Sequence, residues 1–374
     1  MPAPVLVVGA GPAGLTVAHE LARRGVGVRI IERAPVPSPH SRALVLHCRT
    51  QELMEDAGLR DNVAEHAIEL RGMTFRRGGR RLATVPYDLG RYPALSLPQP
   101  QTESVLAGRL EQLGVKVERG RELVGIKQQC DALEVTIGND TMTAAFVVGC
   151  DGAHSTVRRL ADIPFEGDDL PEIMWMADAR LDWDLQPDRV WQLLHSDGML
   201  SAIPMPAGLW RLVTLRTLDE GEPTGQFFER AIVARTSAKP RRLDIKWTST
   251  FRVSCRLASA YGRGRVLLAG DAAHIHSPIG GQGMNLAIQD AFCLARRLAA
   301  GIASPPEAIL EPYQLERRPV AAAVMRTNAR VTRLAMSTGP VQRLVRDHVM
   351  PRLLSLSPIA RRAGLEAAGL QSHT

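Results

Sequence analysis

The spacing of apolar and polar positions alternates between two periods along the chain, which predicts strands interleaved with helices. Residues 5–8 are uniformly apolar, as in a strand buried on both faces of a parallel sheet. Leu15, Ala18 and Leu21 follow at helical spacing, and residues 26–31 form a second apolar strand. This beginning predicts an α/β fold.

The pattern changes twice further along, which predicts an inserted second domain. Short strands are expected at 73–76 and 81–85, followed by a helix capped by Thr102. Residues 163–262 are strand-rich and carry the tryptophans, most of which we expect to pack a sheet. We predict a discontinuous first domain of residues 1–70, 99–162 and 263–304, a second domain of residues 71–98 and 163–262, and a C-terminal helical segment of residues 305–374.

Three glycines directly after the first strand have the spacing G-x-G-x-x-G. Gly9 permits a tight turn, Gly11 lets a pyrophosphate approach the backbone, and Gly14 lets the helix pack closely on the sheet. Glu32 ends the second strand about 20 residues later, where an acid bonds a ribose hydroxyl. An ordinary glycine turn would share the spacing, but the strand, helix, strand and acid together favour a dinucleotide site.

A second glycine-rich motif follows an apolar strand at 266–269. An acid at a strand end can bond a ribityl or ribose hydroxyl, and glycines allow backbone N–H groups to approach a ligand. The helix that opens after the turn favours negative charge at its N-terminus. This motif contains Gly270, Asp271, Gly280, Gly281, Gly283 and Met284.

A third motif lies between these two, in the stretch 146–158 that includes Asp151 and Arg158. Together the three ordered motifs resemble the FAD-dependent aromatic hydroxylases, the single-component flavoprotein monooxygenases. The resemblance covers nearly the whole chain, including a helix at 310–320 similar to the one that follows the family's flavin domain. It implies a Rossmann-like, glutathione-reductase-like FAD-binding domain, an inserted α+β substrate domain dominated by a mixed sheet, and C-terminal helices.

The resemblance also implies the cofactors and the reaction. FAD is expected to bind tightly without a covalent bond, and O2 is expected as co-substrate. The chain has no second dinucleotide fingerprint, so NADPH or NADH is expected to bind only transiently. The implied reaction is hydroxylation of a phenolic or polyketide-like ring through a flavin C4a-hydroperoxide.

The resemblance also implies which residues of this chain form the flavin site. The N–H groups of Met284 and Asn285 are expected to stabilise charge on reduced flavin. Pro278 matches a proline whose carbonyl faces the substrate ring, and it could stiffen the loop at the same time. Asp271, Arg42 and Gln99 are expected to contact the cofactor, with a surface position as the lesser alternative. Cofactor contacts are expected from Gly9, Gly11, Pro12, Ala13, Gly14, Glu32, Arg33, Arg42, Gln99, Asp151, Gly270, Asp271, Pro278, Gly281, Gly283, Met284 and Asn285.

Histidines are the side chains best suited to act as a base on a phenol. His47 lies in a stretch that the family places near the pocket, so it is the first candidate. His195, His274 and His276 are candidates by residue type only. For each of them a structural, hydrogen-bonded role is the stronger interpretation.

Composition narrows the class of protein further. The chain has 374 residues, enough for two domains, and no apolar run long enough to span a membrane. Its five scattered cysteines predict a reducing, cytoplasmic setting without disulfides, and no metal site is expected. The strand begins almost at once, so no signal peptide is expected, and the chain ends before a thioredoxin-like C-terminal domain could fit.

The formal net charge of +7 leaves the choice of partner open. The excess consists of arginine pairs dispersed along the sequence without an aromatic stripe, which predicts a solvated surface that attracts anionic cofactors rather than nucleic acid. The expected partner is a small aromatic substrate, and the expected assembly is a monomer or a homodimer.

Other functions on the same fold remain open. An epoxidase, a Baeyer–Villiger-type enzyme or a reductase would share the flavin motifs. A flavin halogenase is disfavoured because its W-x-W-x-I motif is absent. A non-catalytic binding protein of this fold typically loses the flavin contacts, whereas both signatures are intact here.

Overall fold

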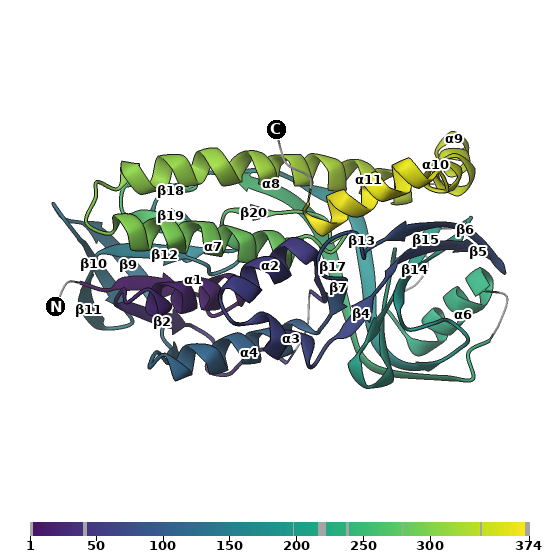
Figure 1. The fold of residues 1–374 in the computed structure, drawn as a ribbon, viewed down its shortest axis with the longest axis horizontal. Coiled ribbons are helices and arrows are strands. Elements are labelled where there is room, and N and C mark those ends of the chain that lie inside the picture. The colour runs from purple at the N-terminus through teal and green to yellow at the C-terminus, as the bar shows by residue number, and fades with distance from the viewer. Residues whose placement is uncertain are drawn as a thin grey trace.

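The computed structural model describes residues 3–39, 43–196, 198–215, 222–236, 239–278, 280–336 and 339–370. Two large sheets lie side by side along the long axis, joined by two long strands, β13 (Phe165–Asp182) and β17 (Arg242–Ala258) (Figure 1). The N-terminus lies at the end of the first sheet, and the C-terminal helices cover the second.

The first sheet has six strands in the order β18-β19-β12-β1-β2-β8. Neighbouring strands run parallel except for the pair β18 and β19. Its central strands are buried on both faces, which explains why they are uninterrupted apolar runs. The strands are β1 (Val5–Val8), β2 (Val28–Glu32), β8 (Val117–Arg119), β12 (Phe146–Gly149), β18 (Gly262–Arg263) and β19 (Val266–Leu268).

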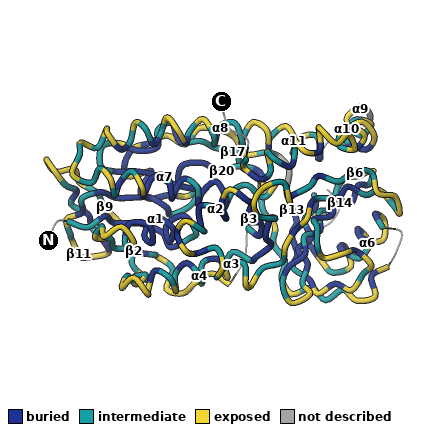
Figure 2. Tube along the Cα trace, viewed as in Figure 1, coloured by how far each residue is buried: buried dark blue, intermediate teal, exposed yellow. Residues whose placement is uncertain are grey.

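Helices α1 (Pro12–Arg23) and α7 (Gly283–Gly301) pack on each other against this sheet, and both are mostly buried (Figure 2). The long helix α8 (Glu307–Met336) lies outside α7 and exposes its outer side. Helix α4 (Gln99–Gln112) packs on α1. A three-stranded antiparallel sheet follows it, formed by β9 (Leu123–Gln128), β10 (Leu133–Ile137) and β11 (Asp140–Ala144), and then comes α5 (Thr156–Leu160).

The second large sheet has eight strands in the order β20-β17-β13-β16-β15-β14-β5-β6. It is mixed, because β14 and β5 run parallel while the other neighbours are antiparallel. Trp175, Trp191 and Trp210 are buried in its core against α6 (Gly225–Thr236), as expected for packing residues. The remaining strands are β5 (Gly72–Arg77), β6 (Arg80–Pro86), β14 (Arg189–His195), β15 (Gly198–Met205), β16 (Leu209–Leu215) and β20 (His274–Ile275).

A small sheet and two helices fill the space between the large sheets. The small sheet has the order β3-β7-β4 and is antiparallel. These elements are β3 (Val45–Leu46), β4 (Ile68–Leu70), β7 (Ala94–Ser96), α2 (Cys48–Asp56) and α3 (Arg60–Ala64). Among the described helices, none has the length and apolar character needed to cross a membrane.

The C-terminal segment after α8 is helical. Helix α9 (Pro340–Leu344) continues through a π-helical turn, Val345–Val349, into α10 (Met350–Leu354), and α11 (Ser357–Ala368) follows. The buried side chain of Arg346 in the π-helical turn donates to the carbonyl of His195 at 2.7 Å, which fixes these helices to the second sheet.

One sequence-based expectation is wrong. Thr102 does not cap its helix, because α4 begins at Gln99 with Pro98 as its N-cap, and the Thr102 hydroxyl is buried without a hydrogen-bond partner. The fold also brings Arg81 and Arg361 to one groove, although they lie 280 positions apart in the sequence.

The mixed α/β architecture with C-terminal helices is confirmed. The sequence did not predict β11 and β20, which are short or have few buried positions. The domain boundaries stay a prediction.

Candidate flavin site

Gly9, Gly11 and Gly14 lie in and after the turn between β1 and α1, and different atoms surround each of them. A side chain at Gly9 would collide with the carbonyl of Cys150, and Gly9 has a φ of +102°. A side chain at Gly14 would collide with the carbonyl of Gly9. The space beside Gly11, in contrast, has no atom within 4 Å. Gly9 and Gly14 therefore serve packing, and Gly11 leaves an open cradle at the N-terminus of α1.

Glu32 closes this cradle from the end of β2. Its carboxylate accepts hydrogen bonds from the N–H groups of Ala10 and Ala34, both at 2.9 Å. Each carboxylate oxygen has further lone pairs for a ligand hydroxyl. The acid thus joins the glycine turn to the neighbouring strand and retains acceptor capacity.

The second glycine motif comes to the same edge of the sheet. Gly270 follows β19 in a 3₁₀ turn, Gly270–Ala272, with a φ of +63°. A Cβ at Gly270 would lie 3.1 Å from that of Ala13 in α1 and 3.0 Å from that of Ala287 in α7. The N-terminal halves of α1 and α7 therefore meet at Gly270. Two helix N-termini, which favour negative charge, are gathered at one site.

Asn285 in the first turn of α7 holds the loop that contains Gly280 and Gly281, called the glycine loop below, against β3. Its side-chain amide donates to the carbonyls of Val45 at 2.7 Å and Gly281 at 2.8 Å, and its Oδ1 accepts from the N–H of His47 at 2.8 Å. The first N–H groups of a helix have no intrahelical acceptor. Those of Met284 and Asn285 are thus available to a ligand while the asparagine side chain fixes the loop.

His47 lies at the N-terminus of α2 and contacts the same loop. Its ring Nε2 is 3.1 Å from the carbonyl of Gly280, and its ring packs edge-on to Tyr87. Burial lowers the pKa of His47 to about 4, although the bond to Gly280 opposes this shift. His47 is therefore neutral at pH 7, with Nε2–H donating to Gly280.

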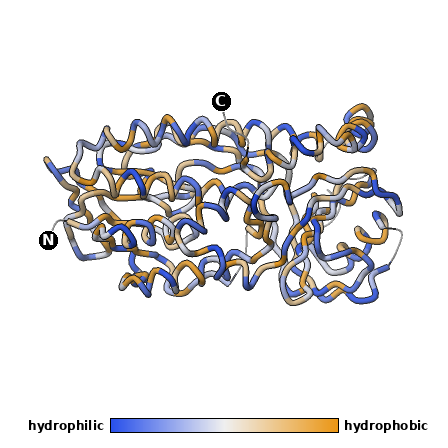
Figure 3. The backbone as a smooth tube through the Cα atoms, in the orientation of Figure 1, coloured by the Kyte–Doolittle hydropathy of each residue, from blue (hydrophilic) through white to orange (hydrophobic). Residues whose placement is uncertain are grey.

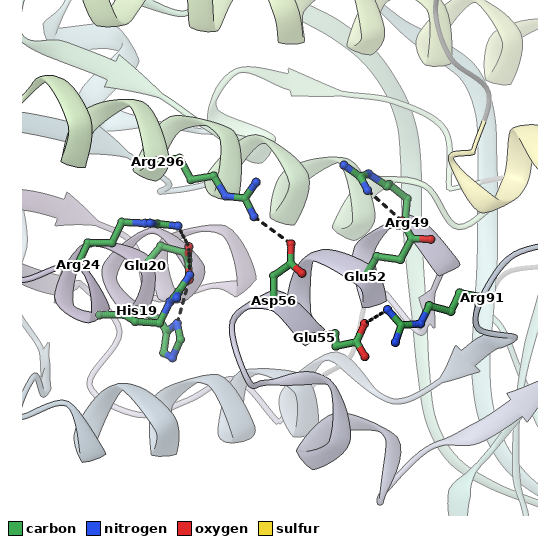
Figure 4. Close-up of polar contacts among 10 residues, drawn as sticks. His19, Glu20, Arg24, Arg49, Glu52, Glu55, Asp56, Arg91 and Arg296 are labelled. Atoms are coloured by element: carbon green, nitrogen blue, oxygen red, sulfur yellow. Dashed lines mark hydrogen bonds and ion pairs between the residues drawn. The ribbon is translucent and has the colours of Figure 1, made fainter.

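Ion pairs connect α2, the helix that follows His47, to neighbouring segments (Figure 4). Asp56 accepts from Arg296 of α7 at 3.3 Å. Glu55 pairs with Arg91 at 2.7 Å. These contacts connect α2 to elements on both sides of it.

A more buried acid supports α1, the helix of the cradle (Figure 4). Burial would raise the pKa of the Glu20 carboxyl, but bonds from His19, Arg23 and Arg24 outweigh burial and lower the pKa to about 2. Glu20 is fully buried, and the two arginine contacts are 2.9 and 3.0 Å.

The third motif connects the other two. Asp151 caps α5, accepting from the N–H groups of Thr156 at 2.7 Å and Val157 at 3.1 Å. Arg158 is buried above the ring of Phe165 and donates to the carbonyl of Ala272, beside Asp271, at 2.8 Å. Through Arg158 the motif thus positions the turn Gly270–Ala272, called the G-D turn below, and the sequence did not predict this role.

A buried ionic network lies behind the loop. Asp290 of α7 accepts from Arg317 of α8 at 2.7 Å and contacts His274 Nε2 at 2.6 Å. Burial would raise the pKa of Asp290, but Arg317 and His274 outweigh it and hold the pKa below its usual range. The network ties the G-D turn to both helices. An acid within the apolar stretch 287–300 was the available sequence signal.

The other histidines have structural partners. His276 contacts Asn328 of α8 at 3.1 Å, and burial lowers its pKa to about 4. His195 lies at the end of β14, where its carbonyl binds Arg346. Neither contact involves the glycine loop.

The remaining predicted residues lie around this arrangement. Pro12 is the first residue of α1, and Gly283 is the first residue of α7. Gln99 accepts from the N–H of Ala43 at 3.2 Å and donates to Glu103 at 2.8 Å. The carbonyl of Pro278 accepts from Gly281 N–H at 3.0 Å. Arg33 and Asp271 are exposed, and Arg42 lies outside the described residues.

The site fits FAD by its shape and its donors. The open space at Gly11, the carboxylate of Glu32 and the paired N-termini of α1 and α7 match a dinucleotide with an anionic ring system. Among the described residues, no group of three or more His, Cys, Asp or Glu side chains could hold a metal ion.

Comparisons with known proteins agree with this site. The family model described as FAD binding domain matches residues 2–328. A 12-dehydrotetracycline 5-monooxygenase/anhydrotetracycline 6-monooxygenase of Streptomyces rimosus is 36% identical over 355 residues, which cover 90% of this chain and 70% of the relative.

Solved structures are similar over nearly the full chain. The p-nitrophenol 4-monooxygenase PnpA of Pseudomonas putida has a TM-score of 0.90 at 25% identity, covering 100% of this chain and 99% of that one. The anhydrotetracycline hydroxylase OxyS of Streptomyces rimosus has a TM-score of 0.82 at 34% identity, covering 100% of this chain and 77% of that one.

The fold and the site define a flavoprotein oxidoreductase. The chain belongs to the FAD-binding-domain family of aromatic monooxygenases.

Proposed function

We propose that the protein hydroxylates a phenolic or polyketide-like aromatic ring, using FAD, O2 and NADPH or NADH. The observation that carries this proposal is the meeting of the α1 and α7 N-termini at Gly270, which joins a dinucleotide cradle to a ring-binding loop. The substrates in the names of the relatives, anhydrotetracycline and p-nitrophenol, support the substrate class.

Bound FAD supplies the redox chemistry, accepting a hydride from the nicotinamide and, once reduced, activating oxygen. In the balanced reaction, NAD(P)H, a proton, O2 and the aromatic substrate give NAD(P)+, the hydroxylated ring and water. The protein supplies position and electrostatics. Gly11 and Glu32 would hold the dinucleotide, and the N–H groups of Met284 and Asn285 would stabilise negative charge on the reduced ring.

The remaining predicted contacts belong to the same proposal. Gly281, Pro278 and Asp271 would contact the flavin from the glycine-rich motif, and the predicted cofactor contacts of Arg42 and Gln99 are part of the proposal. Neutral His47 donates a hydrogen bond to the carbonyl of Gly280 and so positions this residue. That His47 also acts as a base on the substrate stays a hypothesis.

We also propose that the domains have the boundaries predicted from the sequence. The protein is proposed to work in the cytoplasm, as a monomer or a homodimer. The five cysteines, all without disulfides, support a reducing setting. Burial raises the pKa of the Cys150 thiol above its usual range, which makes Cys150 an inert packing residue rather than a nucleophile.

The test is oxygen labelling with the FAD-loaded protein. NADPH or NADH is supplied under 18O2 with a panel that includes p-nitrophenol and anhydrotetracycline. One labelled oxygen atom is expected in an organic product, with oxygen consumed in step with nicotinamide. Nicotinamide oxidation without label in any product would instead favour a reductase, and label in an epoxide or ester would favour the other flavin enzymes of this fold.

A further inference from the structure

Positive charge is concentrated where the β5–β6 hairpin meets the C-terminal helices. Residues 71–91 contain six arginines and one acid, Asp88, and residues 339–370 contain five arginines and two acids. Helices α10 and α11 both pack on β6. These two segments therefore have a larger net positive charge than the +7 of the whole chain.

A groove of about 720 Å³ lies in this region, between β6 and the first turn of α11. Its volume is in the range of small-ligand sites. Arg81 of β6, Arg189 of β14 and Arg361 of α11 line it. Arg189 pairs with Asp188 at 2.8 Å. Arg81 and Arg361 are exposed and form no ion pair within the part of the chain that the structure describes, so the groove is lined by two arginines without a counter-charge.

Apolar and polar groups line the space between these arginines in similar measure. Positions along α10 and α11 alternate between hydrophilic and hydrophobic (Figure 3). The hydroxyls of Thr84 and Ser357 add hydrogen-bonding groups. The apolar lining residues form the apolar wall of the groove and are Leu82, Ala83, Pro86, Leu89, Leu354 and Ala360. A ligand that satisfies this lining combines an apolar body with an anionic group.

Helix α11 connects the groove to the flavin loop. Its first turn lines the groove, and near its other end the carbonyl of Ala367 accepts from Gln282, the residue before α7, at 2.7 Å. Gly364 packs between these ends against the carbonyl of Pro86, where a side chain would collide. The groove is therefore separate from the flavin site but shares a rigid element with it.

We propose that this groove is a second binding site, for an anionic amphiphile with a small apolar body, such as an aromatic ring system, and one phosphate, sulfonate or carboxylate group. Arg81 and Arg361 bind the anion, because guanidinium groups form charge-assisted, bidentate hydrogen bonds with such groups. The apolar wall binds the body. This site requires neither flavin reduction nor hydroxylation by the protein.

The test is calorimetric titration of the FAD-loaded full chain with 1-naphthyl phosphate. The double variant R81S/R361S is expected to weaken binding at least tenfold. The matched control R80S/R362S removes the same charge from neighbouring positions that do not line the groove, where Arg362 pairs with Glu366, and is expected to change binding less than threefold. Both variants alter exposed side chains, so melting curves and FAD absorbance check that each remains folded.

Two further ligands measure the contributions of the anionic group and of the apolar body separately. Inorganic phosphate is expected to compete with 1-naphthyl phosphate at higher concentration, because it has the anion alone. Uncharged 1-naphthol is expected to bind both double variants equally. No binding of 1-naphthyl phosphate to the unmodified protein, or equal affinity of R81S/R361S and R80S/R362S, would overturn the proposal. Failure of the oxygen-labelling experiment would leave these titrations unaffected, so the two proposals fail separately.

Discussion

Gly11 and Gly14 differ in what surrounds their α-carbons, and this difference predicts opposite effects of the same substitution. Gly11→Ala places a methyl group in open space, so the fold is expected to persist while FAD binding weakens by about 100-fold, since the cradle is filled. Gly14→Ala drives a methyl group into the carbonyl of Gly9 and is expected to destabilise the protein by about 3 kcal/mol or more.

Urea unfolding of the FAD-free variants and FAD titration of the folded ones measure the two effects separately. If Gly11→Ala bound FAD as tightly as the unmodified protein, the cradle would not hold the cofactor.

Two buried histidines predict that stability falls in mild acid. Burial lowers the pKa of His47 and His276 to about 4 from an ordinary value of 6.5. The unfolded chain therefore binds protons that the fold excludes, so stability is fully present above pH 6.5 and declines as the pH falls to about 4. The loss is about 3 kcal/mol for each histidine over this window.

The free energy of unfolding, measured at several pH values in this window, checks this expectation. The variant H47N/H276N is expected to have a flatter profile, although its stability at pH 7 is lower. A profile as steep as that of the unmodified protein would assign the acid sensitivity to other groups.

At the scale of elements, Asp290 joins α7, α8 and the G-D turn through one buried carboxylate. Asp290→Asn would leave Arg317, which is 8% exposed, without its counter-charge, and the expected cost is about 3–5 kcal/mol. The matched control Asp56→Asn breaks the exposed contact between α2 and Arg296 and is expected to cost about 0.5 kcal/mol. Thermal unfolding compares the stabilities of the two variants. Equal losses of stability would contradict a special role of the buried network around Asp290.

The elements themselves were predictable to different degrees. Strand β6 covers its predicted range, 81–85, because alternating burial along a strand is visible in the sequence. Thr102 was misassigned as a cap because Pro98 and the following residues begin the helix one turn earlier. Strand β20 has only two residues and exists through its pairing with β17, which no local pattern encodes.

At the scale of the whole molecule, the motifs predicted which segments form the flavin site but not what holds them. The glycine spacing identified Gly11 and Gly270, since a turn and a close approach constrain a sequence locally. The contacts of Arg158 with Ala272 and of Arg317 with Asp290 join segments far apart in the chain, so only the fold reveals them. The grouping of Arg81 with Arg361 has the same origin.

The central claim is that NADPH or NADH reduces the bound flavin for the hydroxylation of an aromatic substrate, and we expect that substrate to accelerate the reduction. Anaerobic stopped-flow mixing of the FAD-loaded protein with NADPH or NADH, with and without each phenol of a panel, tests it most directly. The account predicts that at least one phenol accelerates the loss of flavin absorbance sharply. Reduction that is equally fast without any phenol, or no reduction by either nucleotide, would contradict it.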